Sequence, residues 1–494
     1  MFMKILFTHS YFYKFDEKQW LFKQPYPPLG TILAAAVMRE KGFDVSLFDT
    51  NLRDDPTEIK AFLQNHNPKY VVIYDDGFNY LTKMCLTNMR EAAFILAEES
   101  KKFGCTVIIS SSDSADHYKK YFEHRVDYVV KGEGEETLSQ LIDALENGKN
   151  MDGIHGVIYQ KNDEAVVNPP RLVIRDLDTL PIPAWDLVDI QSYKSIWLRY
   201  HGYFSLNLAT TRGCPFKCNW CAKPIYGNRY TSRSPMHVIK EITFLLEHFA
   251  PDHFWMSDDI FGLKPGWVQM FNTLVHQNNL RFKYKIQSRV DLLLEEDTLD
   301  ALAQSGAETI WVGAESGSQK ILDAMDKGTT VNQIYEASTA MKQRGIKTGF
   351  FLQFGYLSET QEDIDATLKM VLDLMPDEIG ISVSYPLPGT KFYEKVKDQL
   401  HEKQNWTDSN DLAMMFRSTF SSAYYKELHQ YIHAVYRKHK GYATLRKLFR
   451  NPLRLNRKDL RSGLATFYYI PSSITKRRRL NKLKNTSNKM APSL

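Results

Sequence analysis

Two stretches of the chain alternate short apolar runs with segments of helical periodicity, and this alternation restricts the possible folds more than any other feature. Within residues 3–150 the apolar runs are KILFTHS, DVSLFDT, YVVIYDD, TVIISSS and VDYVVKGEGE, and helical segments such as LGTILAAAVMREKG separate them. Strands that alternate with helices build the crossover units of a parallel sheet. The five runs predict a doubly wound, Rossmann-like sheet whose ligands lie beyond the carboxyl ends of the strands.

A second alternation begins at about Leu206. Its expected strands are SLNLATT, HFWMSDD, FKYKIQSR, TIWVGAES, KTGFFLQFG and EIGISVS. The helix after the first of these opens with Ser234 and Pro235, a favourable N-cap and first-turn pair. Six strand–helix units predict a partial (β/α)6 barrel, and in such barrels the chemistry gathers at the carboxyl ends of the strands.

The length of 494 residues is too great for one hydrophobic core, so we expect several domains. A segment with four prolines, NPPRLVIRDLDTLPIPAWDLVD, separates the two alternating regions, as a connection between domains often does. The predicted division is a doubly wound domain at 1–165, a linker at 166–200, a partial barrel at 201–404 and a basic helical region at 405–494.

The composition, with 43% hydrophobic and 24% charged residues, is that of a soluble globular protein. No apolar run approaches the ~20 residues that cross a bilayer, and the first residues lack a signal-peptide pattern, so we expect a cytoplasmic protein. Five cysteines, three of them clustered, argue against a disulfide framework. We expect the other two, Cys85 and Cys105, to be small buried hydrophobic residues.

The clustered cysteines are Cys214, Cys218 and Cys221, within the stretch TTRGCPFKCNWC. One interpretation is structural zinc, which needs four nitrogen or sulfur ligands. The fourth would have to come from a distant histidine such as His201 or His237, because no second cluster is present. The other interpretation is a [4Fe-4S] cluster, which cysteine thiolates normally hold. Three thiolates would leave one iron open to a substrate or cofactor.

The stretch CPFKCNWC resembles the C-x-x-x-C-x-aromatic-C motif of the radical SAM superfamily, and it follows the first strand of the barrel as that family's motif does. The resemblance implies a [4Fe-4S] cluster held by Cys214, Cys218 and Cys221. It also implies that the open iron binds S-adenosylmethionine (SAM) and that an external electron donor is needed. Reductive cleavage of the sulfonium then gives a 5′-deoxyadenosyl radical that abstracts hydrogen from substrate, while the protein supplies orientation and dry surroundings.

The same resemblance implies a set of residues for SAM at successive strand ends. Relatives often carry Gly-x-Pro-Gly-Glu-Thr after the fifth strand, where this chain reads GYLSET at 355–360 without the Pro-Gly turn. The implied residues are Trp220 beside the adenine, Asp258 and Asp259 for the ammonium group, Arg289 for the carboxylate, and Glu315 and Ser316 for the ribose.

The N-terminal domain resembles that of the cobalamin-binding subgroup, through PPLGTILAAAV (27–37) and VDYVVKGEGEET (126–137). The chain lacks Asp-x-His-x-x-Gly, and its fourth strand ends in SSSDSADH where the subgroup usually has Gly-Gly. An open alternative is therefore a domain that kept the fold and lost cobalamin. The residues that the resemblance implies for cobalamin are Leu29, Gly30, Ser110, Ser111, Ser112, Gly132 and Glu133.

These features predict a radical SAM enzyme that modifies an unactivated carbon of a small or lipid-like substrate, by cobalamin-dependent methylation or a related rearrangement. No residue stands out as a catalytic acid or base. The alternatives are a radical SAM enzyme without cobalamin and, from another class, a zinc-stabilised RNA-binding protein that uses its basic end.

The basic end spans residues 431–494, where 17 Lys and Arg residues face one acidic residue. Leucines interleave with cations between Leu445 and Leu464, and FYYIP and KRRRLNKLK follow. This pattern predicts an interfacial segment for an anionic membrane surface, peripheral at the inner face, in two short helices interrupted at Pro452. The alternative is a solvated tail, disordered past about Thr475. Nucleic acid would bind there only without sequence specificity.

Overall fold

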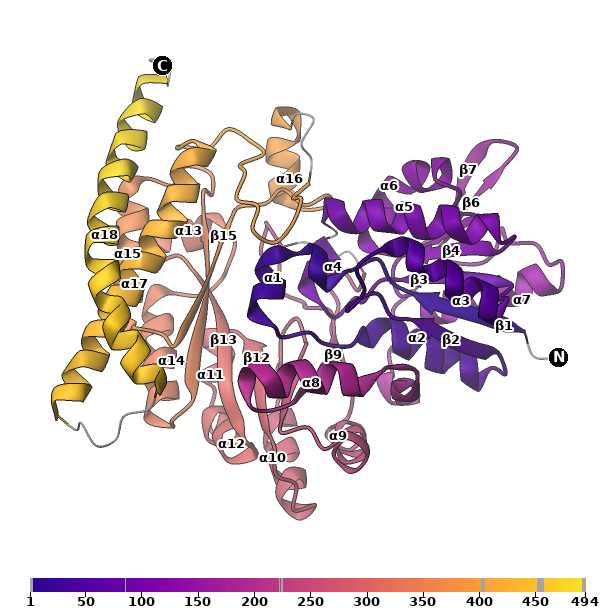
Figure 1. Cartoon of the computed structure of the whole chain (residues 1–494), viewed down its shortest axis with the longest axis horizontal. Helices are drawn as coiled ribbons and strands as arrows, with labels where there is room; N and C mark the ends of the chain where they lie inside the picture. Colours follow the sequence, from indigo (N-terminus) through magenta and orange to yellow (C-terminus); the bar gives the residue numbers. More distant parts are fainter. Residues whose placement is uncertain are drawn as a thin grey trace.

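The computed structural model describes residues 3–84, 86–221, 223, 225–400, 405–450 and 457–490. The N-terminal domain and the C-terminal helices lie on opposite sides of the barrel domain (Figure 1). Cys85 lies outside the described residues, whereas Cys105 is a buried free thiol, as expected.

The N-terminal sheet has seven strands in the order β2-β1-β3-β4-β5-β6-β7, and the first five are parallel. This confirms the doubly wound sheet, in which the strand order reverses between β1 and β3. The predicted strands are β1 (Lys4–Thr8), β2 (Asp44–Phe48), β3 (Tyr70–Tyr74), β4 (Thr106–Ser110) and β5 (Tyr128–Val130). The helices are α1 (Glu17–Phe22), α2 (Leu29–Glu40), α3 (Ile59–His66), α4 (Tyr80–Met84), α5 (Thr87–Lys102), α6 (Ser112–Glu123) and α7 (Glu135–Glu146).

An antiparallel hairpin, β6 (Val157–Lys161) and β7 (Glu164–Val167), extends this sheet and was not expected from the sequence. Asn162 and Asp163 form its turn with φ of 51° and 64°. Two successive residues of positive φ are what a tight hairpin turn needs, and Asn and Asp tolerate that conformation best after glycine. The pair Asn162-Asp163 is therefore the local signal that could have revealed the hairpin.

The barrel sheet is parallel throughout in the order β15-β14-β13-β12-β11-β8, which confirms the six predicted strands. Within the described residues β8 and β15 do not pair, so the barrel is open on one side. Its strands are β8 (Ser205–Leu208), β11 (His253–Met256), β12 (Lys283–Ser288), β13 (Ala307–Glu315), β14 (Lys347–Phe354) and β15 (Glu378–Val383). The short pair β9 (Thr211–Arg212) and β10 (Thr231–Ser232) brackets the cysteine loop.

Helices follow the barrel strands in the expected alternation. In α9 the Ser234 side chain accepts from the His237 amide at 3.1 Å and Pro235 opens the first turn, as predicted. The helices are α9 (Pro235–Phe249), α10 (Trp267–Gln277), α11 (Val290–Leu293), α12 (Thr298–Ser305), α13 (Gln319–Ala324), α14 (Val331–Gln343), α15 (Gln361–Leu374) and α16 (Lys391–Val396). Single 3-10 turns lie at Tyr13–Phe15, Pro56–Glu58, Leu177–Thr179, Trp185–Leu187 and Lys397–Gln399.

The segment 166–200, expected as a linker, packs closely against both domains. It contains the end of β7 and most of α8 (Ile190–His201). Trp185 and Trp197 are each 1% exposed, and the Trp197 indole donates to the Pro25 carbonyl at 2.8 Å. Burying two such large rings ties the segment firmly to the core.

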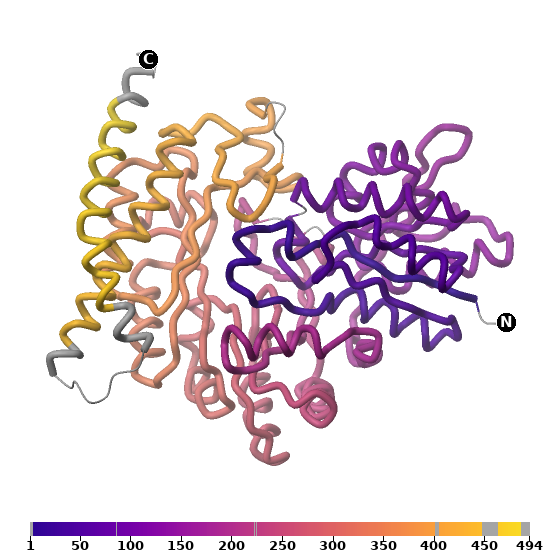
Figure 2. The backbone as a smooth tube through the Cα atoms, viewed as in Figure 1, coloured from indigo at the N-terminus to yellow at the C-terminus, as the bar shows by residue number. Residues whose placement is uncertain are grey.

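Two antiparallel helices close the chain, α17 (Ser422–Arg450) and α18 (Arg457–Met490) (Figure 2). The expected break at Pro452 lies outside the described residues. Both described helices are long, and α18 continues past Thr475, so the alternative of a tail disordered from there is wrong. Residue Pro471 stands inside α18. Packing against α17, with Leu480 buried and Tyr469 accepting from Arg437 at 2.9 Å, overrides the proline's local cost. Among the described helices, none is long and apolar enough to cross a membrane.

A buried arginine joins the N-terminal domain to the start of the cysteine loop. The Arg212 guanidinium pairs with Glu135, the first residue of α7, at 2.6 Å and with Glu133 of the loop after β5. The Phe78 and Tyr226 rings lie 5.7 and 5.3 Å from its central carbon. Burial of this triad removes water from all three charges, so each depends on the others.

Replacing Arg212 by Met should therefore leave two buried carboxylates without a cation and lower the free energy of unfolding by about 3–5 kcal/mol. The measurement is the thermal midpoint and the urea midpoint of purified variants. The triple variant Arg212→Met, Glu133→Gln, Glu135→Gln removes every charge of the triad and should regain most of the loss. A triple variant no more stable than Arg212→Met alone would contradict the role of charge compensation.

Candidate active site

The cysteine loop leaves β9 at Gly213, whose φ is +76°. A β-carbon there would overlap the carbonyl oxygen of Arg229, two residues before β10, so only glycine fits. This close approach folds residues 214–221 back over the carboxyl end of the barrel sheet. The glycine before the motif thus has a structural cause.

Asn219, between the last two cysteines, fastens the loop to the barrel. Its amide nitrogen donates to the Met325 carbonyl at 3.0 Å, and its side chain donates to the Ala324 carbonyl at 2.7 Å. The Tyr356 hydroxyl, from the loop after β14, donates to the Asn219 side-chain oxygen at 2.7 Å. Sequence reasoning missed Asn219 and Tyr356, because their partners lie over 100 positions away in the chain.

The three thiols lie close enough to influence one another. Part of each cysteine stays accessible, yet burial raises the pKa of the Cys221 thiol to about 12, with Lys223 acting in the opposite direction. Burial also raises the pKa of the Cys214 thiol. Within the described residues, no three His, Cys, Asp or Glu side chains gather closely enough to hold one metal ion. A tetrahedral zinc ion needs four donors around a single point, whereas the cysteines of an iron–sulfur cluster bind separate irons.

The histidines considered as a fourth zinc ligand have other partners. His201 Nε2 lies 2.9 Å from the Lys23 carbonyl oxygen. His237 Nδ1 lies 3.4 Å from Asp178 and accepts from Arg233 at 3.1 Å. The donor set of the loop therefore fits a [4Fe-4S] cluster better than zinc.

Arg289, predicted for the SAM carboxylate, contacts the cysteine loop. Its guanidinium carbon lies 3.7 Å from the centre of the Phe216 ring, inside the CPFKC segment. It also bonds Asp291 through Nε at 3.0 Å and donates to the Lys327 carbonyl at 2.8 Å. The contact with Phe216 places Arg289 directly at the cysteine loop.

Glu315, predicted for the SAM ribose, forms a buried ion pair with Lys327 at 2.8 Å. Its backbone has a φ of 56°, an uncommon conformation for a residue with a side chain. Glu315 and the thiol of Cys218 both raise the pKa of Lys327, so the lysine is near the cysteines as well. Sequence reasoning missed Lys327, which follows α13 without any motif around it.

The two adjacent aspartates after β11 separate. Asp258 is buried and accepts from the backbone amides of Thr210 and Thr211 at 2.7 and 2.6 Å, so it holds the entry to the loop. Burial raises the pKa of Asp258 to about 6. Asp259 instead pairs with Lys83 of the N-terminal domain and lies near Cys221, whose pKa it raises. Asp259 thus lies at the cysteine loop, whereas the Asp258 carboxylate is occupied by the backbone amides of Thr210 and Thr211.

Trp220 and Ser316 complete the predicted SAM set. The Trp220 ring packs against the apolar cluster that contains Met325 and Tyr356, and its buried indole N–H has no partner among the described residues. The Ser316 hydroxyl lies 3.1 Å from that of Thr367. A buried donor without a partner is costly and rare in proteins, and a ligand in this place could satisfy the Trp220 N–H.

The loop GYLSET forms a closed turn without the Pro-Gly pair of its relatives. The Gly355 amide donates to the Glu359 carboxylate at 2.7 Å, and Thr360 caps α15. Burial raises the pKa of Glu359 to about 8. A side chain therefore closes the turn that proline and glycine shape in relatives.

The residues predicted for cobalamin make local contacts in the structure. Gly30 donates its amide to Asp76 at 3.0 Å, Ser111 caps α6, and Glu133 belongs to the Arg212 triad. The Ser112 hydroxyl donates to the Lys83 carbonyl of α4 at 2.7 Å. None of the seven lines the large cavity described next: Leu29, Gly30, Ser110, Ser111, Ser112, Gly132 and Glu133. Their part in holding cobalamin stays a prediction.

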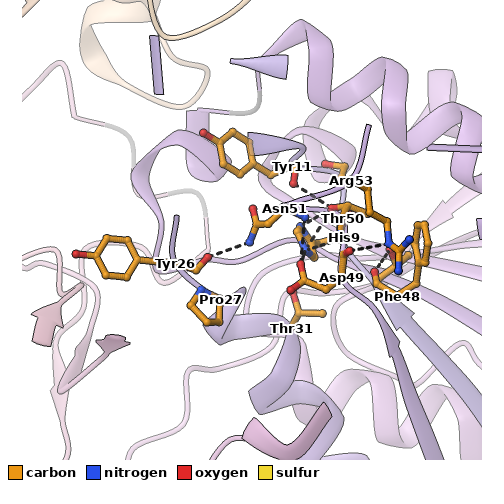
Figure 3. A network of polar contacts seen from close by, with 12 residues as sticks. His9, Tyr11, Tyr26, Pro27, Thr31, Phe48, Asp49, Thr50, Asn51 and Arg53 are labelled. Carbon is orange, nitrogen blue, oxygen red and sulfur yellow. Dashed lines mark hydrogen bonds and ion pairs between the residues drawn. The ribbon is translucent and has the colours of Figure 1, made fainter. Parts of the chain in front are cut away.

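A cavity of about 1270 Å³ lies between the N-terminal domain, the inner face of the barrel sheet and helices α17 and α18. Tyr11 and Tyr26 line it from the segment after β1, and Figure 3 shows both rings directed away from the polar network at the strand ends. In that network His9 lies 2.9 Å from Asp49, and Asn51 donates to the Tyr26 carbonyl at 2.9 Å. The Tyr11 hydroxyl is buried and has no hydrogen-bond partner in the part of the chain that the structure describes.

Comparison with known proteins agrees with this geometry. Residues 208–371 match the Radical SAM superfamily. This segment is therefore a radical SAM domain, and the chain is an enzyme of the radical SAM class.

Curated relatives cover both domains. An uncharacterised methyltransferase of Pyrococcus horikoshii is 29% identical over 77% of this chain and 81% of its own length. The anaerobic magnesium-protoporphyrin IX monomethyl ester cyclase of Synechocystis is 24% identical over 75% of this chain and 73% of its own. The hopanoid C-3 methylase of Methylococcus capsulatus is 24% identical over 85% and 78%.

Two solved structures share the fold. The cobalamin-dependent radical enzyme OxsB, with aqua-cobalamin and SAM bound, superposes with a TM-score of 0.73 over 95% of this chain and 71% of its own, at 17% identity. The methyltransferase TsrM from Kitasatospora setae, with cobalamin and a [4Fe-4S] cluster bound, gives 0.66 over 81% and 75%, at 20% identity. The chain thus has the two-domain fold of cobalamin-dependent radical SAM enzymes.

Proposed function

We propose that the protein is a cobalamin-dependent radical SAM enzyme that methylates or otherwise rearranges an unactivated carbon of a small or lipid-like substrate. The observation that carries this proposal is the meeting of Asp259, Arg289 and the Glu315–Lys327 pair at the cysteine loop. Asp259, Arg289 and Glu315 come from the carboxyl ends of barrel strands or just beyond, where such barrels place their chemistry, and Lys327 follows helix α13.

The residues present fit the cofactors. Cys214, Cys218 and Cys221 would hold the [4Fe-4S] cluster, and the unpaired Trp220 N–H and the carboxylate of Glu315 would contact SAM. When bound, the cluster supplies an electron to the SAM sulfonium, and cobalamin carries a transferable methyl group. An external one-electron donor is required.

Cobalamin would lie against the N-terminal part of the cavity. The Tyr11 hydroxyl without a partner and the exposed ring of Tyr80 line that part. The cavity volume exceeds the 300–1,000 Å³ of most ligand pockets, so it has room for a large ligand beside a substrate. Two relatives are named for a hopanoid and for a porphyrin ester, which supports a large, lipid-like substrate.

The chain itself supplies position and shielding. Asn219 and the Phe216–Arg289 contact hold the cysteine loop in place, and Lys327 neutralises Glu315 away from water. Charges held in a dry site act more strongly on a ligand than charges in water. This arrangement suits a reaction whose reactive intermediate must be kept from solvent.

Replacing any one of Cys214, Cys218 or Cys221 by Ala should abolish iron binding and reductive cleavage of SAM, because the three-thiolate site has no ligand to spare. The measurements are iron and sulfide content after anaerobic purification, and 5′-deoxyadenosine formation with dithionite. Cys105→Ala is the matched control and should keep both. Zinc in place of iron in the unaltered protein would favour the RNA-binding alternative.

Purified protein should bind hydroxocobalamin one to one in equilibrium dialysis. Tyr11→Phe deletes only the unpaired hydroxyl and should weaken binding about threefold to tenfold, the value of one hydrogen bond. Tyr159→Phe, in the distant β6 strand, is the control and should not change it. If the protein retained no cobalamin at micromolar concentration, the alternative of a radical SAM enzyme that does not bind cobalamin would be supported.

We also propose that the protein is cytoplasmic and peripheral at an anionic membrane through α18. Leu464, Phe467 and Ile474 are 65%, 67% and 51% exposed, and helical spacing puts them on one face. Arg478 and Lys482 continue that face and are also exposed. An apolar stripe followed by cations suits the boundary between lipid chains and anionic head groups. The part of the expected interfacial segment at residues 451–456 lies outside the described residues.

Changing Leu464, Phe467 and Ile474 together to Ser should release the protein from phosphatidylglycerol vesicles at low salt, because it removes the apolar surface that the membrane would cover. Leu21→Ser with Leu172→Ser, two exposed leucines elsewhere, is the control and should sediment like the parent. Cosedimentation of the parent with anionic but not neutral vesicles is expected. A parent protein that stays in the supernatant with both would sink the membrane proposal, and equal retention by RNA would favour a general polyanion surface.

A further inference from the structure

Lys285 is an unpaired cation inside the cavity. It lies on β12, and its ammonium nitrogen is 5.1 Å from the ring centres of both Tyr26 and Trp255. These two rings are themselves 4.9 Å apart. No described side chain forms an ion pair or hydrogen bond with Lys285, and its accessible surface faces the cavity that it lines.

Among the described residues, no carboxylate lies within ion-pair distance of Lys285. From β14, Lys347 is paired with Glu308 of β13 at 3.2 Å. From β11, burial lowers the pKa of His253 to about 3, so that ring is neutral. Glu378 of β15 attracts Lys285 from beyond ion-pair distance, while burial lowers the lysine's pKa to about 8. At pH 7 the side chain is therefore mostly charged and poorly solvated, a state that a bound anion would stabilise.

The wall next to Lys285 is aromatic. Trp311 of β13 stacks on Phe351 of β14 with ring centres 4.7 Å apart. A β-carbon at Gly349 would overlap the Trp311 ring, so this glycine lets the ring lie flat against the strand. Both rings line the cavity, as does Tyr436 of α17. The cavity thus combines broad apolar faces with Lys285, whose ammonium group forms no hydrogen bond or ion pair among the described residues. Three further cations line the cavity, and each bonds a neutral group: Lys18 the Ser409 carbonyl, Arg437 the Tyr469 hydroxyl and Lys476 the Gln430 side chain.

We infer that the cavity binds an anionic amphiphile, and that Lys285 contacts the carboxylate or phosphate group of that molecule. The inference rests on the proposed function, because it names the substrate class of the same site. Aromatic faces bind the apolar body, and the ammonium group fixes its orientation, as a few polar groups do in most ligand pockets. Lys285 would act as a specificity-determining residue and not as a ligand of the cofactors.

The test uses two fluorescent probes of the same shape, anilinonaphthalene sulfonate, which is anionic, and N-phenylnaphthylamine, which is neutral. Lys285→Met should weaken binding of the anionic probe about tenfold at pH 7 and leave the neutral probe unchanged. Lys285→Arg should restore binding of the anionic probe, because it keeps the positive charge. Affinity of the parent for the anionic probe should fall as the pH rises from 7 to 9, since Lys285 loses its proton there, and Lys285→Met should not show this fall.

Lys347→Met is the matched control, because it removes a neighbouring cation that already has a carboxylate partner, and it should change anionic affinity less than twofold. Displacement of the anionic probe by dodecanoate or by dodecyl phosphate, with dodecanol as the neutral competitor, distinguishes the two head groups. Equal loss of both probes in Lys285→Met, or loss of neither, would overturn the inference. Reductive SAM cleavage is measured separately and should persist in Lys285→Met, so failure of the proposed function would be recognised by its own assay.

Discussion

The buried pairing of Arg212 with Glu133 and Glu135 determines how the two halves of the molecule work together. Arg212 directly precedes Gly213 and the first cysteine, so the same residue that anchors the N-terminal domain also begins the cofactor loop. A buried ion pair contributes little net stability once desolvation is counted. Its directional contacts instead fix one relative position of the strand-end loops, and the cavity between the domains depends on that position.

The strands were predictable because their signal is local. Short apolar runs that alternate with helical segments mark β1 to β5 and the six barrel strands, wherever the pairing partners lie. Side-chain partners are not local, and there the sequence was less informative. Asp258 stands at a strand end and was predicted for the SAM ammonium group, yet it accepts from two threonine amides more than 40 positions earlier. Glu133, expected near cobalamin, meets an arginine 79 positions later.

In the C-terminal region, local sequence signals argued against a helix that the structure contains. Proline and a dense cluster of cations both argue locally against a helix at residues 471–484. The helix forms because α17 offers an apolar face to Leu480 and the segment around it, and tertiary packing contributes more than intrinsic propensity. What the sequence did indicate was the mixture of apolar and basic residues, and the structure sorts part of that mixture onto an exposed face of α18.

The two faces of α18 link the surface to the interior. Tyr468, Ser472 and Lys476, spaced by one helical turn each, line the cavity, while Phe467, Ile474 and Arg478 face outward. Helix α18 therefore lies between the cavity that contains Lys285 and the outer surface proposed to bind lipid. An anionic amphiphile would meet apolar and cationic side chains on the outer face of α18, and it would meet aromatic rings and Lys285 in the cavity on the inner side. The proposed substrate class and the proposed membrane contact are thus chemically consistent, although each is supported by different residues and fails by a different test.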